Sequence, residues 1–183
     1  MAGTAEVITR MDRLPGVHYP GQSYKQHTSA LYSHIHVVLV PNTKGLDSLT
    51  SVLSANPTLQ PPPSDEISIF TAATDAFTKA NLNTTVHESL ARLAAVTRSA
   101  LDQGLRVRGY VSVVVMCPFS GKVDYRRVRE VAKELLDMGC YEVSLGDTVG
   151  KGTPATIAEM LEEVKKAVPV EKLAVRHPYN ELT

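Results

Sequence analysis

The sequence predicts an α/β protein built on a parallel β-sheet, and three observations carry this prediction. Segments rich in β-branched residues begin near residues 66, 107, 141 and 172, a spacing of about 30 to 40 residues that is the size of a βαβ unit. Helix-length segments separate them, and the central one is apolar on both faces, as parallel strands covered by helices are. An open doubly wound sheet and part of a (β/α)₈ barrel both fit, because a complete barrel needs roughly 250 residues and this chain has 183.

The strands are expected at four places along the chain. Residues 66–70 alternate in polarity and lead into small residues, as a strand leaving a sheet does. Residues 107–116 contain three consecutive valines and form the strongest strand prediction. Residues 141–145 and 172–175 are shorter runs of the same kind, and residues 37–40 are a further candidate strand.

Capping residues delimit the helices between these strands. Thr85 and Glu88 have the spacing of a capping box, and the helix that follows is expected to end at Gly104. Two more helices are expected over residues 124–139, from an Asp cap to a Gly stop, and over residues 153–169, where a Thr-Pro pair begins the helix and a proline ends it.

The composition argues against several classes of function. Nineteen Lys and Arg balance nineteen Asp and Glu, so no basic excess is present to hold nucleic acid or an anionic membrane. The longest apolar run, residues 113–117, is far shorter than the ~20 residues that span a bilayer. Two cysteines form neither a disulfide framework nor a zinc spacing. We therefore expect a soluble intracellular protein with no nucleic-acid and no membrane partner.

Candidate site residues stand where the predicted strands end, because ligands of parallel α/β sheets gather at the carboxyl ends of the strands. These candidates are Thr71, Thr74, Cys117, Asp147, Thr148 and His177. Asp147 lies between two glycines that let a ligand approach the backbone. An aspartate that caps a turn fits the same pattern, so a site residue and a structural residue both remain open. For Cys117 we favour a buried structural thiol.

Other polar residues give weaker signals. Arg108 and Tyr110 are two residues apart and share one face of their strand; inside a barrel, the arginine would need an anionic partner or ligand. His34 and His36 have metal-ligand spacing, but they lie in a segment without periodicity and are not expected to bind a metal. The glycines around Lys151 do not form a nucleotide triphosphate loop, because no Ser or Thr directly follows the lysine.

Several runs of residues, in order, resemble the hydroxymethylglutaryl-CoA lyase family. They are Val40-Pro-Asn-Thr-Lys-Gly45, Phe70 through Asn83, Val107-Arg-Gly-Tyr-Val-Ser112, Cys117-Pro118, Met138-Gly-Cys-Tyr-Glu-Val-Ser-Leu-Gly-Asp-Thr-Val-Gly150 and Gly152-Thr153-Pro154. The resemblance covers about residues 38–175 and a stretch within residues 6–20. It points to this lyase rather than to isopropylmalate or homocitrate synthases, because the Arg-Gly-Tyr-Val and Gly-Cys-Tyr-Glu runs are its own.

The resemblance implies the fold and the domain organisation. It implies that residues 1–183 form a single partial TIM-barrel domain of the pyruvate-carboxyltransferase-like type, with parallel βαβ units that make about strands 3 to 7 of a (β/α)₈ barrel. The family runs directly from the Tyr-Pro of residues 19–20 to the Val-Leu of residues 38–39. Residues 21–37 are therefore expected to be a disordered insertion.

The resemblance also implies an activity and a set of site residues. Members of the family bind Mg²⁺ or Mn²⁺ and cleave 3-hydroxy-3-methylglutaryl-CoA to acetyl-CoA and acetoacetate, in leucine catabolism and ketone-body formation. Asp147 matches the catalytic residue beside the reacting hydroxyl, and Arg108, Tyr110 and Thr148 match substrate-binding positions. An acyl-CoA substrate, a homodimer and a mitochondrial location are implied as well, although we expect no transit peptide in this chain.

The chain departs from the family at the expected metal ligands. The Arg-Asp pair of strand one has no counterpart, and the strand-eight Asn and catalytic Cys of the family are expected beyond Thr183. The His-x-His pair after strand seven is replaced by Arg176-His177-Pro178. No metal ligand is therefore secure, with His177 a weak candidate. The alternative to a lyase is a non-catalytic fragment of that enzyme.

Overall fold

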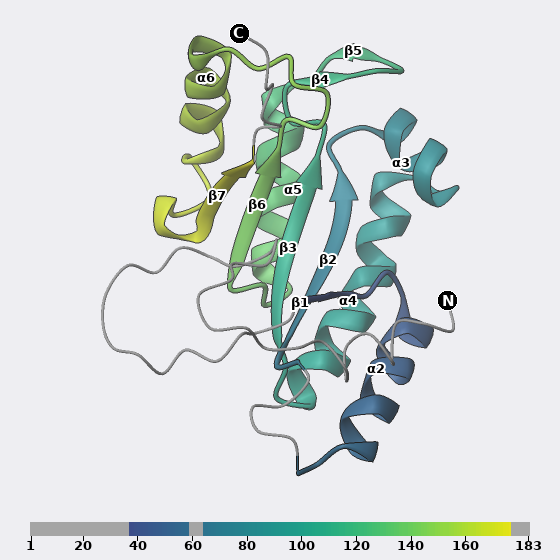
Figure 1. Cartoon of the computed structure of the whole chain (residues 1–183). Helices are drawn as coiled ribbons and strands as arrows, with labels where there is room; N and C mark the ends of the chain where they lie inside the picture. Colours follow the sequence, from purple (N-terminus) through teal and green to yellow (C-terminus); the bar gives the residue numbers. More distant parts are fainter. Residues whose placement is uncertain (1–36, 59–63, 177–183) are drawn as a thin grey trace, which may run out of the picture.

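The computed structural model describes residues 37–58 and 64–176. Its main sheet has five strands in the order β1-β2-β3-β6-β7, and every neighbouring pair is parallel (Figure 1). The strands are Val37–Leu39 (β1), Glu66–Ala72 (β2), Arg106–Ser112 (β3), Glu142–Gly146 (β6) and Leu173–Arg176 (β7). The predicted α/β class with a parallel sheet is confirmed.

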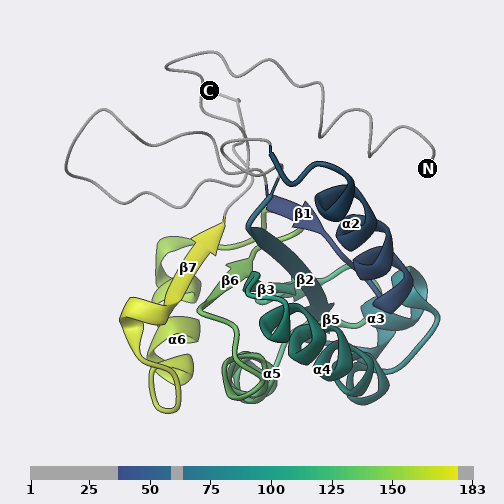
Figure 2. The same cartoon turned by 90° about the horizontal axis from the view of Figure 1, so that it is seen from below.

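Helices connect consecutive strands and lie outside the curved sheet. They are α2 (Thr43–Ala55), α3 (Asp75–Leu82), α4 (Val86–Asp102), α5 (Tyr125–Asp137) and α6 (Pro154–Val164), and a short 3₁₀ helix, η1 (Val170–Lys172), precedes β7. Figure 2 shows α4, α5 and α6 along the convex side of the sheet. Helices on one side of a curved parallel sheet form the wall of a barrel, whereas a doubly wound sheet carries helices on both faces. The partial-barrel prediction is confirmed.

The predicted helix starts agree with the structure. The Thr85 side chain accepts from the Glu88 backbone and the Glu88 side chain accepts from the Thr85 backbone, which completes the capping box of α4. Asp124 caps α5 and Thr153 caps α6. Gly104 follows α4 with a φ of +76°, a left-handed conformation that favours glycine.

Other boundaries were predicted wrongly. The third predicted helix ends at Val164 rather than at residue 169, because the chain leaves the helical path in turns before the proline. Two helices, α2 and α3, were not predicted. The first is rich in Ser, Thr and Gly, residues with weak helix propensity. Its cap is clear in the structure, where the Asn42 side chain accepts from the Gly45 amide.

The expected strand at 107–116 is also shorter than predicted. It ends at Ser112 because Val113 adopts a φ of +54°, a conformation that is unusual for a β-branched residue. The Val113 amide donates to Thr148 Oγ1 at 2.8 Å instead of continuing the ladder. The chain then forms an antiparallel hairpin of β4 (Met116–Cys117) and β5 (Gly121–Lys122).

Strand register decides which side chains face the helices. A Cβ added at Gly109 would lie 3.1 Å from Leu135 Cδ1 and 3.3 Å from Cys140 Sγ, so Gly109 faces α5. Arg108 and Tyr110, one residue to either side, therefore lie on the opposite, concave face. The helix-facing side of the central strands is buried and mostly apolar; its apolar residues include Ile67, Ile69, Val107, Val111, Val143 and Leu145. Thr71 pairs with Val111 and is 1% exposed, so this candidate site residue faces the helices and not the concave face.

Some predictions concern residues that the structure does not describe. The expected insertion at 21–37 lies outside the described residues except for Val37, which begins β1. His34, His36 and His177 also lie outside them. Within the described residues, no helix combines the length and apolarity needed to cross a membrane.

Candidate active site

The carboxyl ends of β2, β3 and β6 lie at one edge of the sheet. Ala72 pairs with Ser112, and Val111 pairs with Leu145, so the three strands end at nearly the same level. Asp147 directly follows β6, and Thr74 follows β2. Thr74 Oγ1 donates to Cys117 Sγ at 3.2 Å, which joins the hairpin after β3 to the same edge. The structure thus brings together most of the described candidates.

The Asp147 carboxylate is held by the loop that follows it. Oδ1 accepts from the Lys151 amide at 3.2 Å, and Oδ2 accepts from the Gly152 amide at 2.7 Å. The residue is 1% exposed, and its own amide donates to the Arg176 carbonyl at 2.9 Å. Asp147 therefore closes the loop between β6 and α6, which is the turn-capping role left open by the sequence. A catalytic role remains a prediction.

Thr148 also has a structural contact. Its Oγ1 accepts from the Val113 amide and so joins the loop after β6 to the end of β3. Because Val113 is fully buried, this acceptor satisfies an amide that cannot reach water. The predicted substrate-binding role of Thr148 has to be compatible with this contact.

Arg108 has its anionic partner on the neighbouring strand. Its Nε donates to Glu142 Oε1 at 2.7 Å, and its Nη2 forms an ion pair with the same carboxylate. Its Nη1 donates to the Tyr110 hydroxyl at 2.7 Å. Glu142 was not predicted, although the alternation of the Glu-Val-Ser-Leu run was a signal that Glu142 shares a face with Ser144.

A second polar cluster lies where β2 and β3 begin. Glu66 accepts from the Tyr141 hydroxyl at 2.8 Å and pairs with Arg106 at 3.3 Å, and the Arg106 guanidinium lies 4.2 Å from the centre of the Tyr141 ring. Burial raises the pKa of Glu66, and the Tyr141 hydrogen bond and the Arg106 charge only partly oppose this. This cluster was not predicted, and it lies at the end of the sheet opposite to Asp147.

The two cysteines have different environments. Burial raises the pKa of the Cys140 thiol to about 12, which fits its expected place in the core. Burial acts in the same direction on Cys117, but hydrogen bonds from Ser120, Thr74 and the Phe119 and Ser120 amides outweigh it and lower the Cys117 pKa. Cys117 is 2% exposed, in agreement with the buried thiol that the sequence favoured.

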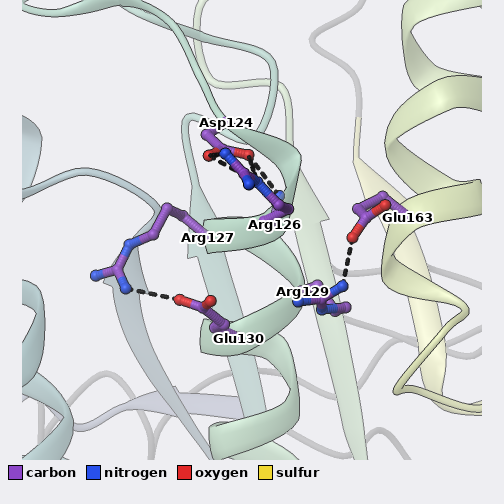
Figure 3. Close-up of polar contacts among 6 residues, drawn as sticks. All are labelled: Asp124, Arg126, Arg127, Arg129, Glu130 and Glu163. Atoms are coloured by element: carbon purple, nitrogen blue, oxygen red, sulfur yellow. Dashed lines mark hydrogen bonds and ion pairs between the residues drawn. The ribbon is translucent and has the colours of Figure 1, made fainter.

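The arginines of α5 are paired with acidic side chains (Figure 3). Arg126 binds its own helix cap, Asp124, at 2.8 Å, and Arg127 binds Glu130 at 2.7 Å. Arg129 pairs with Glu163 and so joins α5 to α6. All three pairs neutralise their arginines, and the Arg129–Glu163 pair holds two helices of the barrel wall together. Nothing in them points to an anion site.

The described residues do not fit a catalytic cation. In residues 37–58 and 64–176, no group of three or more His, Cys, Asp or Glu is placed to hold a metal ion. Hard cations such as Mg²⁺ take several oxygen ligands, and the Asp147 oxygens accept from loop amides. The donor set of the described residues therefore does not match the Mg²⁺ or Mn²⁺ that the resemblance implies.

A curved parallel sheet with helices on its convex side defines part of a TIM barrel. The profile of the family described as HMGL-like matches residues 35–183. The chain belongs to the HMGL-like family, which is metal-dependent in general.

Individual relatives agree with this family. The chain is 41% identical over 175 residues to the mitochondrial hydroxymethylglutaryl-CoA lyase of Bos taurus, covering 96% of this chain and 46% of the relative. It is also 41% identical to the cytoplasmic 3-hydroxy-3-methylglutaryl-CoA lyase of Rattus norvegicus, covering 96% and 43%. The crystal structure of the HMG-CoA lyase from Brucella melitensis superposes with a TM-score of 0.77 at 38% identity, covering 97% of this chain and 53% of that one. The chain thus spans about half the length of these relatives.

Proposed function

We propose that this chain forms the substrate-binding central wall of a hydroxymethylglutaryl-CoA lyase. The observation that carries the proposal is the position of Arg108 and Tyr110 on the concave face of the sheet, with Asp147 at the carboxyl end of the neighbouring strand. In a barrel enzyme substrates bind at the carboxyl ends of the strands, where Asp147 lies. The substrate class is an acyl-CoA, and the reaction is cleavage of 3-hydroxy-3-methylglutaryl-CoA.

The reaction needs a base for the tertiary hydroxyl of the substrate. When that proton leaves, the hydroxyl oxygen becomes the ketone of acetoacetate and the adjacent carbon–carbon bond breaks. The bonding electron pair passes to the enolate of acetyl-CoA, which is then protonated. Asp147 is the proposed base, and this role requires its carboxylate to exchange at least one of its loop amide contacts for the substrate hydroxyl.

The remaining features of the proposal follow the relatives. Mg²⁺ or Mn²⁺ is the proposed cofactor of the lyase, although the described residues alone do not provide its ligands. A homodimer and a mitochondrial location are proposed because of the family resemblance and the names of the relatives.

A second candidate is a non-catalytic form of the same barrel segment. The observation in its favour is that both carboxylate oxygens of Asp147 and the hydroxyl of Thr148 already serve backbone amides. In this candidate the chain binds the acyl-CoA without turning it over.

Isothermal titration of the purified chain with 3-hydroxy-3-methylglutaryl-CoA and with CoA tests the proposed function. The acyl group adds polar contacts on the concave face, so we expect the substrate to bind about tenfold more tightly than CoA, which corresponds to about 1.4 kcal/mol. Glu130→Gln, on the outer surface of α5, is the control and should bind as the unchanged chain does. Equal affinity for the two ligands, or no binding of either, would overturn the proposal.

A further inference from the structure

We propose that Glu142 is a positioning residue that acts through Arg108 to orient the hydroxyl of Tyr110 toward the substrate. This inference rests on the proposed function, in which the concave face binds an acyl-CoA. It assigns direct contact with the substrate to Tyr110, and it assigns to Arg108 and Glu142 the task of holding that hydroxyl in place.

The strand register brings the three residues together. Arg108 on β3 pairs directly with Glu142 on β6, and side chains at directly opposite positions of paired strands point to the same face. Tyr110 is two residues further along β3 and lies on that face too. The three side chains thus lie along the concave face, with Glu142 and Arg108 at the start of β6 and Tyr110 nearer the carboxyl edge.

The donors of the guanidinium are divided between two partners. An arginine has five N–H donors in a fixed plane. Nε and Nη2 of Arg108 engage the Glu142 carboxylate, and Nη1 donates to the Tyr110 oxygen. Because the carboxylate fixes the plane of the guanidinium, Glu142 determines where Nη1 points.

The Tyr110 hydroxyl consequently acts as a donor toward a ligand. Its oxygen accepts from Arg108, and within the described part of the chain its proton has no acceptor. Arg108 is 8% exposed, whereas Tyr110 is only partly buried. A ligand on the concave face therefore reaches the tyrosine more readily than the arginine, and an oxygen of the acyl group is the kind of acceptor that fits.

The effect of removing Glu142 distinguishes this arrangement from direct binding of the substrate by Arg108. Glu142 neutralises the guanidinium, so the pair adds little net attraction for an anionic substrate. If Arg108 itself bound a substrate carboxylate, removal of Glu142 would release a cation and tighten binding. If Glu142 positions Tyr110, its removal weakens binding.

Two measurements on the full chain test the proposal. In the first, all seven tyrosines carry ¹³C at the ζ position, and Tyr110→Phe identifies the Tyr110 resonance. Glu142→Met, which removes the acceptor at similar volume, should shift this resonance, and Glu142→Gln, which keeps an acceptor, should largely restore it. Glu130→Met is the matched control, because Glu130 pairs with Arg127 at 2.7 Å on the surface of α5, and it should leave the resonance in place.

The second measurement is the affinity for 3-hydroxy-3-methylglutaryl-CoA relative to CoA. Tyr110→Phe and Glu142→Met should each weaken the preference for the acyl-CoA about tenfold, and the double variant should be no weaker than Tyr110→Phe. Such non-additivity is the mark of residues that act through one another. Arg108→Lys is a second variant in case Glu142→Met does not fold; it keeps the charge but cannot reach both partners, and it should give the same loss.

The outcomes distinguish this inference from the proposed function. Tighter binding in Glu142→Met, additive losses in the double variant, or an Arg108→Lys chain that matches the unchanged protein in both measurements would overturn the positioning role. If the unchanged chain does not prefer the acyl-CoA, the proposed function fails. The NMR result then decides the positioning role alone, and an unmoved Tyr110 resonance would overturn it.

Discussion

Substitution of Gly152 by alanine should destabilise the loop that holds Asp147. A Cβ at this position would lie 2.8 Å from Asp147 Oδ2 and 2.9 Å from Ile157 Cδ1, and both distances are shorter than the contacts that a Cβ makes in folded proteins. Overpacking of this kind costs about 1–3 kcal/mol. A loss of about 2 kcal/mol corresponds to a fall in Tm of roughly 4–8 °C for a chain of this size.

Chemical denaturation of Gly152→Ala, with Gly45→Ala as the control, measures this effect. A Cβ at Gly45 would lie 3.4 Å or more from its neighbours, and alanine in a helix is more favourable than glycine by about 0.5–1 kcal/mol. The control should therefore gain stability. Adding Ile157→Val to Gly152→Ala removes one of the two close contacts and should recover part of the loss. A Gly152→Ala chain as stable as the unchanged protein would refute the described contact between Asp147 and the Gly152 amide.

Two further predictions concern the pH dependence of Glu66 and the contact of Thr148. Because burial raises the Glu66 pKa above its usual 4.5, the folded chain holds this proton more tightly than the unfolded chain does. The free energy of unfolding of the unchanged protein, relative to that of Glu66→Gln, should therefore fall as pH rises from about 4.5 through the raised pKa. Urea denaturation of both proteins between pH 4.5 and 8 measures this, and a relative gain with rising pH would show that the pKa is lowered instead. Thr148→Val leaves the buried Val113 amide without its acceptor and should cost about 1–3 kcal/mol in the free energy of unfolding. Thr148→Ser keeps the hydroxyl and should keep most of the stability. Equal losses in the two variants would exclude the lost hydroxyl as the cause of the destabilisation.

Much of the fold followed from local signals in the sequence. The capping box at Thr85 and the Thr-Pro start at residue 153 form their hydrogen bonds within one helical turn, so they can be predicted without knowledge of the tertiary structure. The strand at 66–70 was equally clear, because its helix-facing residues are packed by helices of the same chain. The choice between an open sheet and a barrel wall needed the spatial arrangement of the helices.

Other features depend on contacts between distant residues. The early end of β3 depends on an amide of Val113 that bonds to Thr148, 35 residues away, and no local rule places a valine in a left-handed conformation. The role of Glu142 depends on the register between β3 and β6, which brings it opposite Arg108. The sequence identified Arg108 and predicted that it needs an anionic partner, but it could not say that the partner belongs to the protein.

The proposed function makes this chain the substrate-binding wall of the lyase, and the described residues do not supply the metal ligands that turnover needs; we therefore expect the chain to bind the acyl-CoA without rapid turnover. Acetoacetate release by the purified chain, at saturating Mn²⁺ and with the bovine mitochondrial relative as positive control, tests it most directly. The described donor set does not fit a cation and the Asp147 carboxylate is engaged by its loop. We therefore predict a rate more than about a hundredfold below that of the control, because without a Lewis acid the transition state loses several kcal/mol of stabilisation. A rate within a hundredfold of the control would contradict the account and would require a metal site that includes residues outside those described, with His34, His36 and His177 the first to be substituted.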